Sequence, residues 1–230
     1  RRLTHKHDRK VNKIRKYMAT LNDSVLQGAS GKIGGYVTYS VGNKTYARKL
    51  ADTISNPRSE GQTAQRSKLP GAQTMYRATR GSILEKVYTL VAREEERRSG
   101  YHWFLHTNMN MFGPNDYIDY PRLVLSDGSL QLPFGMKATA IHADKLELEW
   151  LDNTSTVTAQ ATDQLTVVAI FDNEPYQPVV LNDTGFCRSN GKAIVPVPEG
   201  TWTTAHLYCF FAAQDGKRYS PCMYFSISKS

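Results

Sequence analysis

Two histidines, His102 and His106, stand four residues apart in a segment whose apolar spacing indicates a helix, so both could face one metal ion. The zinc-protease pattern needs a glutamate directly after the first histidine, but Trp103 stands there. No third histidine or carboxylate is placed beside the pair by spacing. We therefore expect these histidines on a helix surface or partly buried, without a metal.

Two glycines and a lysine, Gly28, Gly31 and Lys32, suggest a phosphate-binding loop. Such a loop needs a glycine five residues before the last one and Ser or Thr after the lysine. Leu26 and Ile33 occupy those positions. We therefore expect flexible packing glycines and no nucleotide site.

Two carboxylates, Asp116 and Asp119, flank Tyr117 and could form an acid–base pair. The proline-bounded segment 114–121 is more typical of a linker between domains. The sequence also lacks a GxSxG nucleophile elbow and a recognised cysteine–histidine signature. We expect no catalytic residue, no cofactor and no metal. A hydrolase with a dispersed site is a third hypothesis, which a buried acid–base pair in the structure would support.

The composition is that of an ordinary globular protein, since 40% of the 230 residues are hydrophobic and 22% are charged. The three cysteines, Cys187, Cys209 and Cys222, are odd in number and lack a CxxC spacing, which argues against a zinc site or a disulfide framework. No stretch approaches the roughly 20 apolar residues of a membrane helix. We expect a cytoplasmic or virion-associated protein, or a secreted one if a signal peptide preceded Arg1.

Most of the formal charge of +8 lies in residues 1–17, which hold four arginines, four lysines and one aspartate. This segment could bind nucleic acid through counterion release, or it could be a solvated terminus. Met18-Ala19 reads like a natural start, so residues 1–17 could also be foreign to the native protein. The nucleic-acid candidates are Arg1, Arg2, Lys6, Arg9, Lys10, Lys13, Arg15 and Lys16.

The clearest local pattern is a β-hairpin at residues 36–48. Two runs rich in aromatic and β-branched residues flank Gly42-Asn43, a pair typical of a two-residue II′ turn. Residues 30–35 before it are expected to be a flexible approach segment. An isolated hairpin is only marginally stable, so its tyrosines need a partner surface.

Three helices are expected between the hairpin and residue 112. Asn56-Pro57 is predicted to cap and pre-set a helix over residues 58–68, which Pro70-Gly71 would break. A second helix is predicted over 72–92, and Gly81 need not end it. The apolar segment 101–112 predicts the third helix, ended by Gly113-Pro114.

After Tyr120 the apolar period changes to two, which predicts a β-sandwich of seven or eight short strands. Trp150, in an alternating strand, resembles the core tryptophan of immunoglobulin- and fibronectin-III-like sandwiches, and the missing cysteine pair favours the fibronectin variant. A small hairpin is predicted at residues 123–125 and 130–132, and the strands predicted after it cover residues 137–142, 145–151, 164–171, 178–182, 192–197, 206–213 and 219–228.

The predicted fold class is therefore α+β, with an N-terminal β-hairpin and a helical region followed by an immunoglobulin/fibronectin-III-like β-sandwich. The predicted parts are a basic arm (1–17), a Gly-rich segment with the hairpin (18–55), a helical region (56–115) and the sandwich (116–230).

The hairpin and the segment NPRSEGQTAQRSK resemble an uncharacterised family, a domain of unknown function common in Bacteroidota. The resemblance spans residues 18–228 and implies no catalytic residues. Similar openings occur in phage-derived gene neighbourhoods, which implies an assembly component. The matching positions are Met18-Ala19, Gly31-Lys32-Ile33-Gly34, Tyr36 to Tyr46, Arg48, Asn56-Pro57-Arg58-Ser59, Gln62, Arg66, Asp119-Tyr120 and Trp150-Leu151-Asp152-Asn153.

Arg58, Gln62 and Arg66 are four residues apart, so a helix would place them on one face, as an interface clamp or an internal tether of the hairpin. We expect a structural or interaction protein that binds a protein partner or itself, with no small-molecule substrate indicated. The alternative is nucleic-acid association through the basic arm. The interaction candidates are Tyr36, Tyr39, Tyr46, Arg48, Arg58, Gln62 and Arg66.

Overall fold

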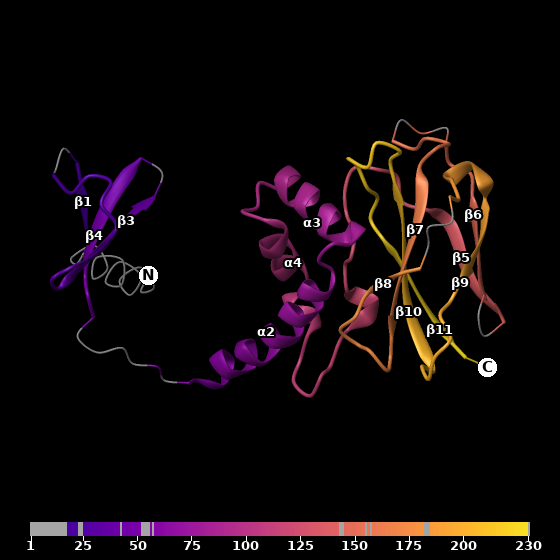
Figure 1. Ribbon diagram of the computed structural model, residues 1–230, viewed down its shortest axis with the longest axis horizontal. Helices are drawn as coiled ribbons and strands as arrows, with labels where there is room; N and C mark the ends of the chain where they lie inside the picture. The colour runs from indigo at the N-terminus through magenta and orange to yellow at the C-terminus, as the bar shows by residue number, and fades with distance from the viewer. Residues whose placement is uncertain are drawn as a thin grey trace, which may run out of the picture. The chain divides into compact units, whose positions relative to one another are not determined.

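The chain forms two compact units, Arg1–Pro57 and Arg58–Ser230, in the computed structural model (Figure 1). The structure describes residues 18–22, 25–41, 43–51, 56, 58–142, 145–154, 156, 158–181 and 185–229. The basic arm at 1–17, with all eight nucleic-acid candidates, lies outside the described residues, as do Gly42 and Pro57.

The first unit contains a four-stranded antiparallel sheet in the order β1-β4-β3-β2. The predicted hairpin is confirmed, because Val41 pairs with Lys44 across a two-residue loop. The expected approach segment is instead a strand, since Ile33 pairs with Tyr36 and Gly34 takes a positive φ of 56° at the turn. The strands are β1 (Met18–Leu21), β2 (Gly31–Ile33), β3 (Tyr36–Val41) and β4 (Lys44–Lys49).

The second unit begins with helices α2 (Glu60–Ala78), α3 (Ile83–Glu94) and α4 (Gly100–Asn108). The predicted break at Pro70-Gly71 is wrong, because α2 runs through both residues. Gly71 instead allows close packing, since an added Cβ would lie 3.0 Å from the ring of Tyr176.

The chain turns at Gly81, between α2 and α3. This glycine takes a φ of +75°, a conformation that favours glycine, so it ends the helical path that was predicted to continue. Ser82 then caps α3 by accepting a hydrogen bond from the Leu84 amide. The third helix is confirmed and continues as the short 3₁₀ turn η1 (Met109–Met111).

The rest of the second unit is a β-sandwich of two antiparallel sheets, ordered β11-β10-β7-β8 and β5-β6-β9. The predicted mixed α and β fold with a sandwich is therefore confirmed. Two further 3₁₀ turns are η2 (Tyr120–Arg122) and η3 (Arg188–Asn190). The strands are β5 (Phe134–His142), β6 (Lys145–Leu151), β7 (Gln164–Phe171), β8 (Val179–Val180), β9 (Lys192–Pro196), β10 (Thr204–Ala212) and β11 (Met223–Ser228).

One prediction for this half is wrong, because residues 123–132 form no strand. The side chains of Leu123 and Leu125 are buried in the core, and the Leu130 amide bonds to the Tyr219 carbonyl. The segment therefore pairs with distant backbone rather than with itself.

The second unit has three layers, with β7 and β10 in the middle (Figure 1). Val168 and Ile170 of β7 join a core with the helices, whereas Val167 and Ala169 join a core with the β5-β6-β9 sheet. Because both faces are covered, β7 is apolar along nearly its whole length rather than alternating.

Candidate interaction surfaces and binding pocket

The N-terminal sheet presents one face that is both aromatic and basic. Tyr39 and Tyr46 are directly opposite each other on β3 and β4, and their rings stack with centroids 5.7 Å apart. Val37 pairs with Arg48 and with Lys32, so these three side chains share that face. Residues 25–51 contain four basic residues and no acidic one. The face therefore combines flat rings with the exposed basic side chains of Lys32, Lys44 and Arg48.

The opposite face carries Tyr36, which separates it from the other two candidate tyrosines. Tyr36 pairs with Ile33 and is 57% exposed. Thr38 and Thr45 on the same face are buried, and Thr45 accepts a hydrogen bond of 2.8 Å from the Gly28 amide. Gly28, which was considered above as part of a phosphate-binding loop, therefore packs on this sheet through its backbone amide.

The described residues of the N-terminal sheet form no hydrophobic core of their own. Among the described side chains of residues 19–51, only the two threonines, Thr38 and Thr45, are buried. Ile33, Tyr36 and Val41 are exposed instead. The sheet is thus held by backbone pairing and polar contacts.

The predicted helix face of Arg58, Gln62 and Arg66 is only partly formed. Ser59, not Asn56, caps α2 by accepting a hydrogen bond from the Gln62 amide. Arg58 lies before the helix with a φ of +46°, so it does not share a helix face with Gln62 and Arg66. These two remain four residues apart in the exposed first half of α2. The seven interaction candidates are thereby divided between the two units.

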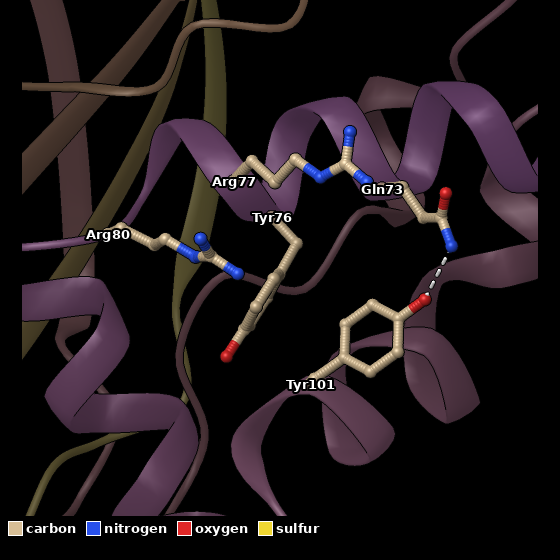
Figure 2. A pocket seen from close by; sticks show the side chains of 5 residues that line it. All are labelled: Gln73, Tyr76, Arg77, Arg80 and Tyr101. Atoms are coloured by element: carbon tan, nitrogen blue, oxygen red, sulfur yellow. Dashed lines mark hydrogen bonds between the residues drawn. The ribbon is translucent and has the colours of Figure 1, made fainter.

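A pocket of about 280 Å³ lies between α2 and α4 (Figure 2). Four of its residues come from α2 or the turn after it, and the fifth comes from α4. Gln73 donates a hydrogen bond of 2.8 Å to the hydroxyl of Tyr101. Sequence reasoning missed this pocket, because no local pattern predicts that Tyr101 lies beside Gln73, which is 28 residues away in the chain. The lining residues are Gln73, Tyr76, Arg77, Arg80 and Tyr101.

The electrostatics of the pocket centre on Tyr76. Burial raises the pKa of Tyr76 most, the Glu85 carboxylate raises it further, and Arg80 lowers it. Tyr76 is therefore a neutral hydroxyl at physiological pH, while both arginines are charged.

The residues first considered for chemistry are dispersed. His102 and His106 are exposed, and no group of three metal-ligating side chains occurs among the described residues. Asp116 accepts a hydrogen bond from Tyr176, and burial, helped by this hydrogen bond, raises the pKa of Tyr176 to about 12. Asp119 forms an ion pair with Arg122 instead. The two carboxylates thus do not act as a pair.

One acid–base cluster was not predicted from sequence. His206 shares a hydrogen bond of 2.8 Å with the Tyr224 hydroxyl, and the ring of Tyr120 stacks on it at 3.6 Å. Burial lowers the pKa of His206, and Asp172 opposes this shift. Asp172 is itself held by Thr203 and the following amide. These contacts join η2 to strands β10 and β11. The cluster therefore packs segment 120–122 against the sandwich.

A buried ion pair in the sandwich was also missed. Arg188 and Asp163 are 0% and 1% exposed, and their side chains meet at 3.1 Å. Arg188 also donates to Asn153 and to the Gln131 carbonyl, and its guanidinium lies 4.0 Å from the ring centre of Phe211. Trp150, the predicted core tryptophan, is buried and donates to the Arg188 carbonyl.

Comparison of the sequence with models of known protein families identifies the family of this chain. The family of unknown function DUF6266 matches residues 28–226, from just before β2 of the N-terminal sheet to the last strand of the sandwich, β11. The chain belongs to the DUF6266 family. The predicted membership of an uncharacterised domain family is thereby confirmed. No curated protein matches this DUF6266 member.

Solved structures similar to this DUF6266 member include β-sandwich domains. A redesigned β-sandwich protein is 18% identical, with a TM-score of 0.32, covering 44% of this chain and 92% of that chain. The fn3 domain of human contactin 1 is 5% identical, with a TM-score of 0.28, covering 46% of this chain and 82% of that chain.

No described helix has the length and apolar character required to cross a membrane.

Proposed function

We propose that this DUF6266 chain is a non-catalytic interaction protein whose N-terminal sheet, residues 18–49, binds a protein surface. The observation that carries the proposal is the lack of any buried hydrophobic side chain among the described residues of this sheet. A sheet gains independent stability when it has a hydrophobic face to bury or another element to pack against. A partner surface that covers Val37, Tyr39 and Tyr46 would supply that burial.

The charge of the sheet indicates what kind of partner it fits. Its aromatic face carries Lys32, Lys44 and Arg48, and residues 25–51 contain no acidic residue. Complementary potentials favour an acidic partner, whereas two such faces would repel each other. The sandwich half, residues 123–230, has 7 basic and 11 acidic residues. A sheet of one copy on the sandwich of another would be a head-to-tail contact, which builds rings or filaments.

Light scattering coupled to size-exclusion chromatography of the full chain tests this proposal. We expect association that grows with protein concentration and weakens as salt is raised, since the contact pairs opposite charges. The double variant Tyr39→Ser/Tyr46→Ser should weaken association at least about tenfold, because it removes the two stacked rings. Tyr36→Ser, on the opposite face, is the matched control and should associate like the wild type.

A monomer at every concentration, unchanged when residues 31–50 are deleted, would contradict self-association through the sheet. Equal effects of the double variant and of Tyr36→Ser would contradict the assignment of the binding face. These two outcomes are separable, because the first concerns the oligomer and the second concerns which side of the sheet forms it.

Nucleic-acid association is the second candidate, and the same face favours it. Stacked tyrosines beside lysines are the chemistry with which single strands are bound, through base stacking and phosphate contacts. The expected result is binding of single-stranded DNA or RNA that falls steeply with salt and is lost in Tyr39→Ser/Tyr46→Ser. Removal of residues 1–17 measures the contribution of the basic arm. Salt-independent or absent binding would exclude this candidate.

The sandwich is proposed to be of the fibronectin type III kind. In a constant-type immunoglobulin domain, the fourth strand joins the sheet of the first, second and fifth strands. Here the fourth strand, β8, pairs with the third strand, β7, at Val168–Val180 and Ala169–Val179. This strand order supports the fibronectin variant predicted from Trp150, and such sandwiches often serve as interaction modules.

A further inference from the structure

The pocket between α2 and α4 is lined almost entirely by hydrogen-bond donors. Gln73, Tyr76, Arg77 and Arg80 follow one another at helical spacing, so they project from one side of α2 and the turn that follows it (Figure 2). Tyr101 closes the pocket from α4. The helix pair therefore brings two guanidinium groups and two tyrosine rings to the same space.

The hydroxyl of Tyr101 is oriented by its neighbour. Because it accepts a hydrogen bond from the Gln73 amide, its own proton is available to donate to another group. Arg77 and Arg80 can only donate. No carboxylate is among the described residues that line the pocket. An incoming group must therefore supply acceptors.

The two arginines lack a counterion among the described residues. Neither the Arg77 nor the Arg80 guanidinium group forms an ion pair or a hydrogen bond with any residue that the structure describes. The nearest acid that influences Tyr76, Glu85, accepts a hydrogen bond of 2.8 Å from the Gly81 amide. The positive charge at the pocket is thus open to a negative ligand.

The aromatic side of the pocket is fixed by the core. The ring of Tyr76 lies 5.1 Å from that of Tyr101, edge to face, and also contacts the rings of Tyr88 and Phe104 at 6.0 and 5.8 Å. Tyr88 and Phe104 are fully buried. Such a wall is preorganised, so a flat apolar group can pack on it at little conformational cost.

We propose that this pocket binds a small oxyanion, a carboxylate or a phosphate group, attached to a flat apolar group. Guanidinium groups bind both anions with charge-assisted hydrogen bonds, and the Tyr101 hydroxyl provides a further donor. A volume of about 280 Å³ fits a single ring with its anionic group rather than a larger ligand. The site lies in the second unit and does not depend on the function proposed for the N-terminal sheet.

Nuclear magnetic resonance titration of the full chain tests the proposal with four probes at constant ionic strength. Benzoate and phenyl phosphate carry a ring, whereas acetate and inorganic phosphate do not. We expect saturable shifts of the Arg77 and Arg80 side-chain signals, with Kd of about 1 mM or lower for a ring-bearing probe. The ring-bearing probes should bind at least about fivefold more tightly than the others. Whichever of the two binds more tightly identifies the anion.

Matched variants separate binding from a structural role of the arginines. Arg77→Gln and Arg80→Gln should each weaken binding about tenfold, which corresponds to about 1.4 kcal/mol. Arg93→Gln removes an exposed arginine from the last turn of α3, outside the pocket, and should leave the affinity unchanged. Tyr101→Phe keeps the ring and should weaken binding about fivefold.

Two results would overturn the proposal. One is a set of shifts that do not saturate, or that are equal at Arg77, Arg80 and Arg93, since this would show non-specific attraction. The other is unchanged affinity in Arg77→Gln and Arg80→Gln with lowered thermal stability, since the arginines would then serve only the end of α2. Equal affinities for probes with and without a ring would overturn the aromatic part of the site.

Discussion

The N-terminal sheet and the sandwich are both antiparallel, but they differ in what their strands bury. The central strands of the sandwich, β7 and β10, bury side chains on both faces, against the helices on one side and the second sheet on the other. In the N-terminal sheet the buried side chains among the described residues are two threonines. Strand pairing alone thus forms a sheet, whereas a second layer supplies most of its stability.

The difference is clearest in how each region treats charge. The sandwich buries an arginine and surrounds it with Asp163, Asn153 and the face of Phe211. The N-terminal sheet leaves Lys32, Lys44 and Arg48 exposed on a face where none of the described residues is acidic. A charge that is enclosed by partners holds one domain together, and a charge that is left exposed is available to another molecule.

The largest effect is expected when the buried charge of the sandwich loses its partner. Arg188→Met should lower the free energy of unfolding of the second unit by about 3–5 kcal/mol, because Asp163 would remain buried and unpaired. Chemical denaturation followed by tryptophan fluorescence measures this. The double variant Arg188→Met/Asp163→Leu should recover a large part of the loss. If the single variant is as stable as the wild type, the ion pair does not organise the sandwich.

Replacement of two tyrosines in the core that faces the helices should change the stability of the fold in opposite directions. The Tyr88 hydroxyl is the one buried polar side-chain atom without a partner among the described residues, so Tyr88→Phe should stabilise the fold by about 1 kcal/mol. The Tyr208 hydroxyl donates a hydrogen bond of 2.9 Å to the Tyr120 carbonyl, so Tyr208→Phe should destabilise it by about 1 kcal/mol. Thermal unfolding measures both changes. Shifts of the same sign would contradict the polar contacts of this core.

A smaller effect is expected from pH, through His206. Burial lowers its pKa in the folded state below the ordinary value of 6.5, so the unfolded chain binds the proton more readily. Stability is therefore full above this value and falls as the pH drops through about 6.5 and below. Denaturation from about pH 7.5 to about pH 5.5 should show this loss, and His206→Gln should reduce it. A rise in stability over that range would contradict the sign.

Local patterns were sufficient to predict the hairpin, the third helix, most of the sandwich strands and the buried Trp150. They failed where contacts with residues distant in the chain determine the local structure. Residues 123–132 alternate like a hairpin, but their backbone pairs with Tyr219, about 90 residues away in the chain. Pro70 did not break α2, because Ala72 and Met75 are anchored in the core beyond it. Tertiary burial outweighs local propensity at such positions.

The candidate sites show the same limit. Alternation predicts that Tyr39 shares a face with Val37 and Val41 but not with Tyr36, whereas only the register of the hairpin places it opposite Tyr46. The hydrogen-bond partners of Arg188 come from segments up to 57 residues away in the chain, so no local motif predicts this buried network. The pocket requires α4 to place Tyr101 beside Gln73 of α2, 28 residues away in the chain, which no local pattern predicts.

Native-state hydrogen exchange of the full chain, at a dilution at which it is monomeric, tests the central claim most directly. If the N-terminal sheet lacks its own core, the paired amides of β3 and β4 should exchange at least about 100-fold faster than those of β7 and β10. Addition of a binding partner, or association at high concentration, should slow them. Protection of β3 and β4 equal to that of β7 and β10 in the monomer would contradict the account.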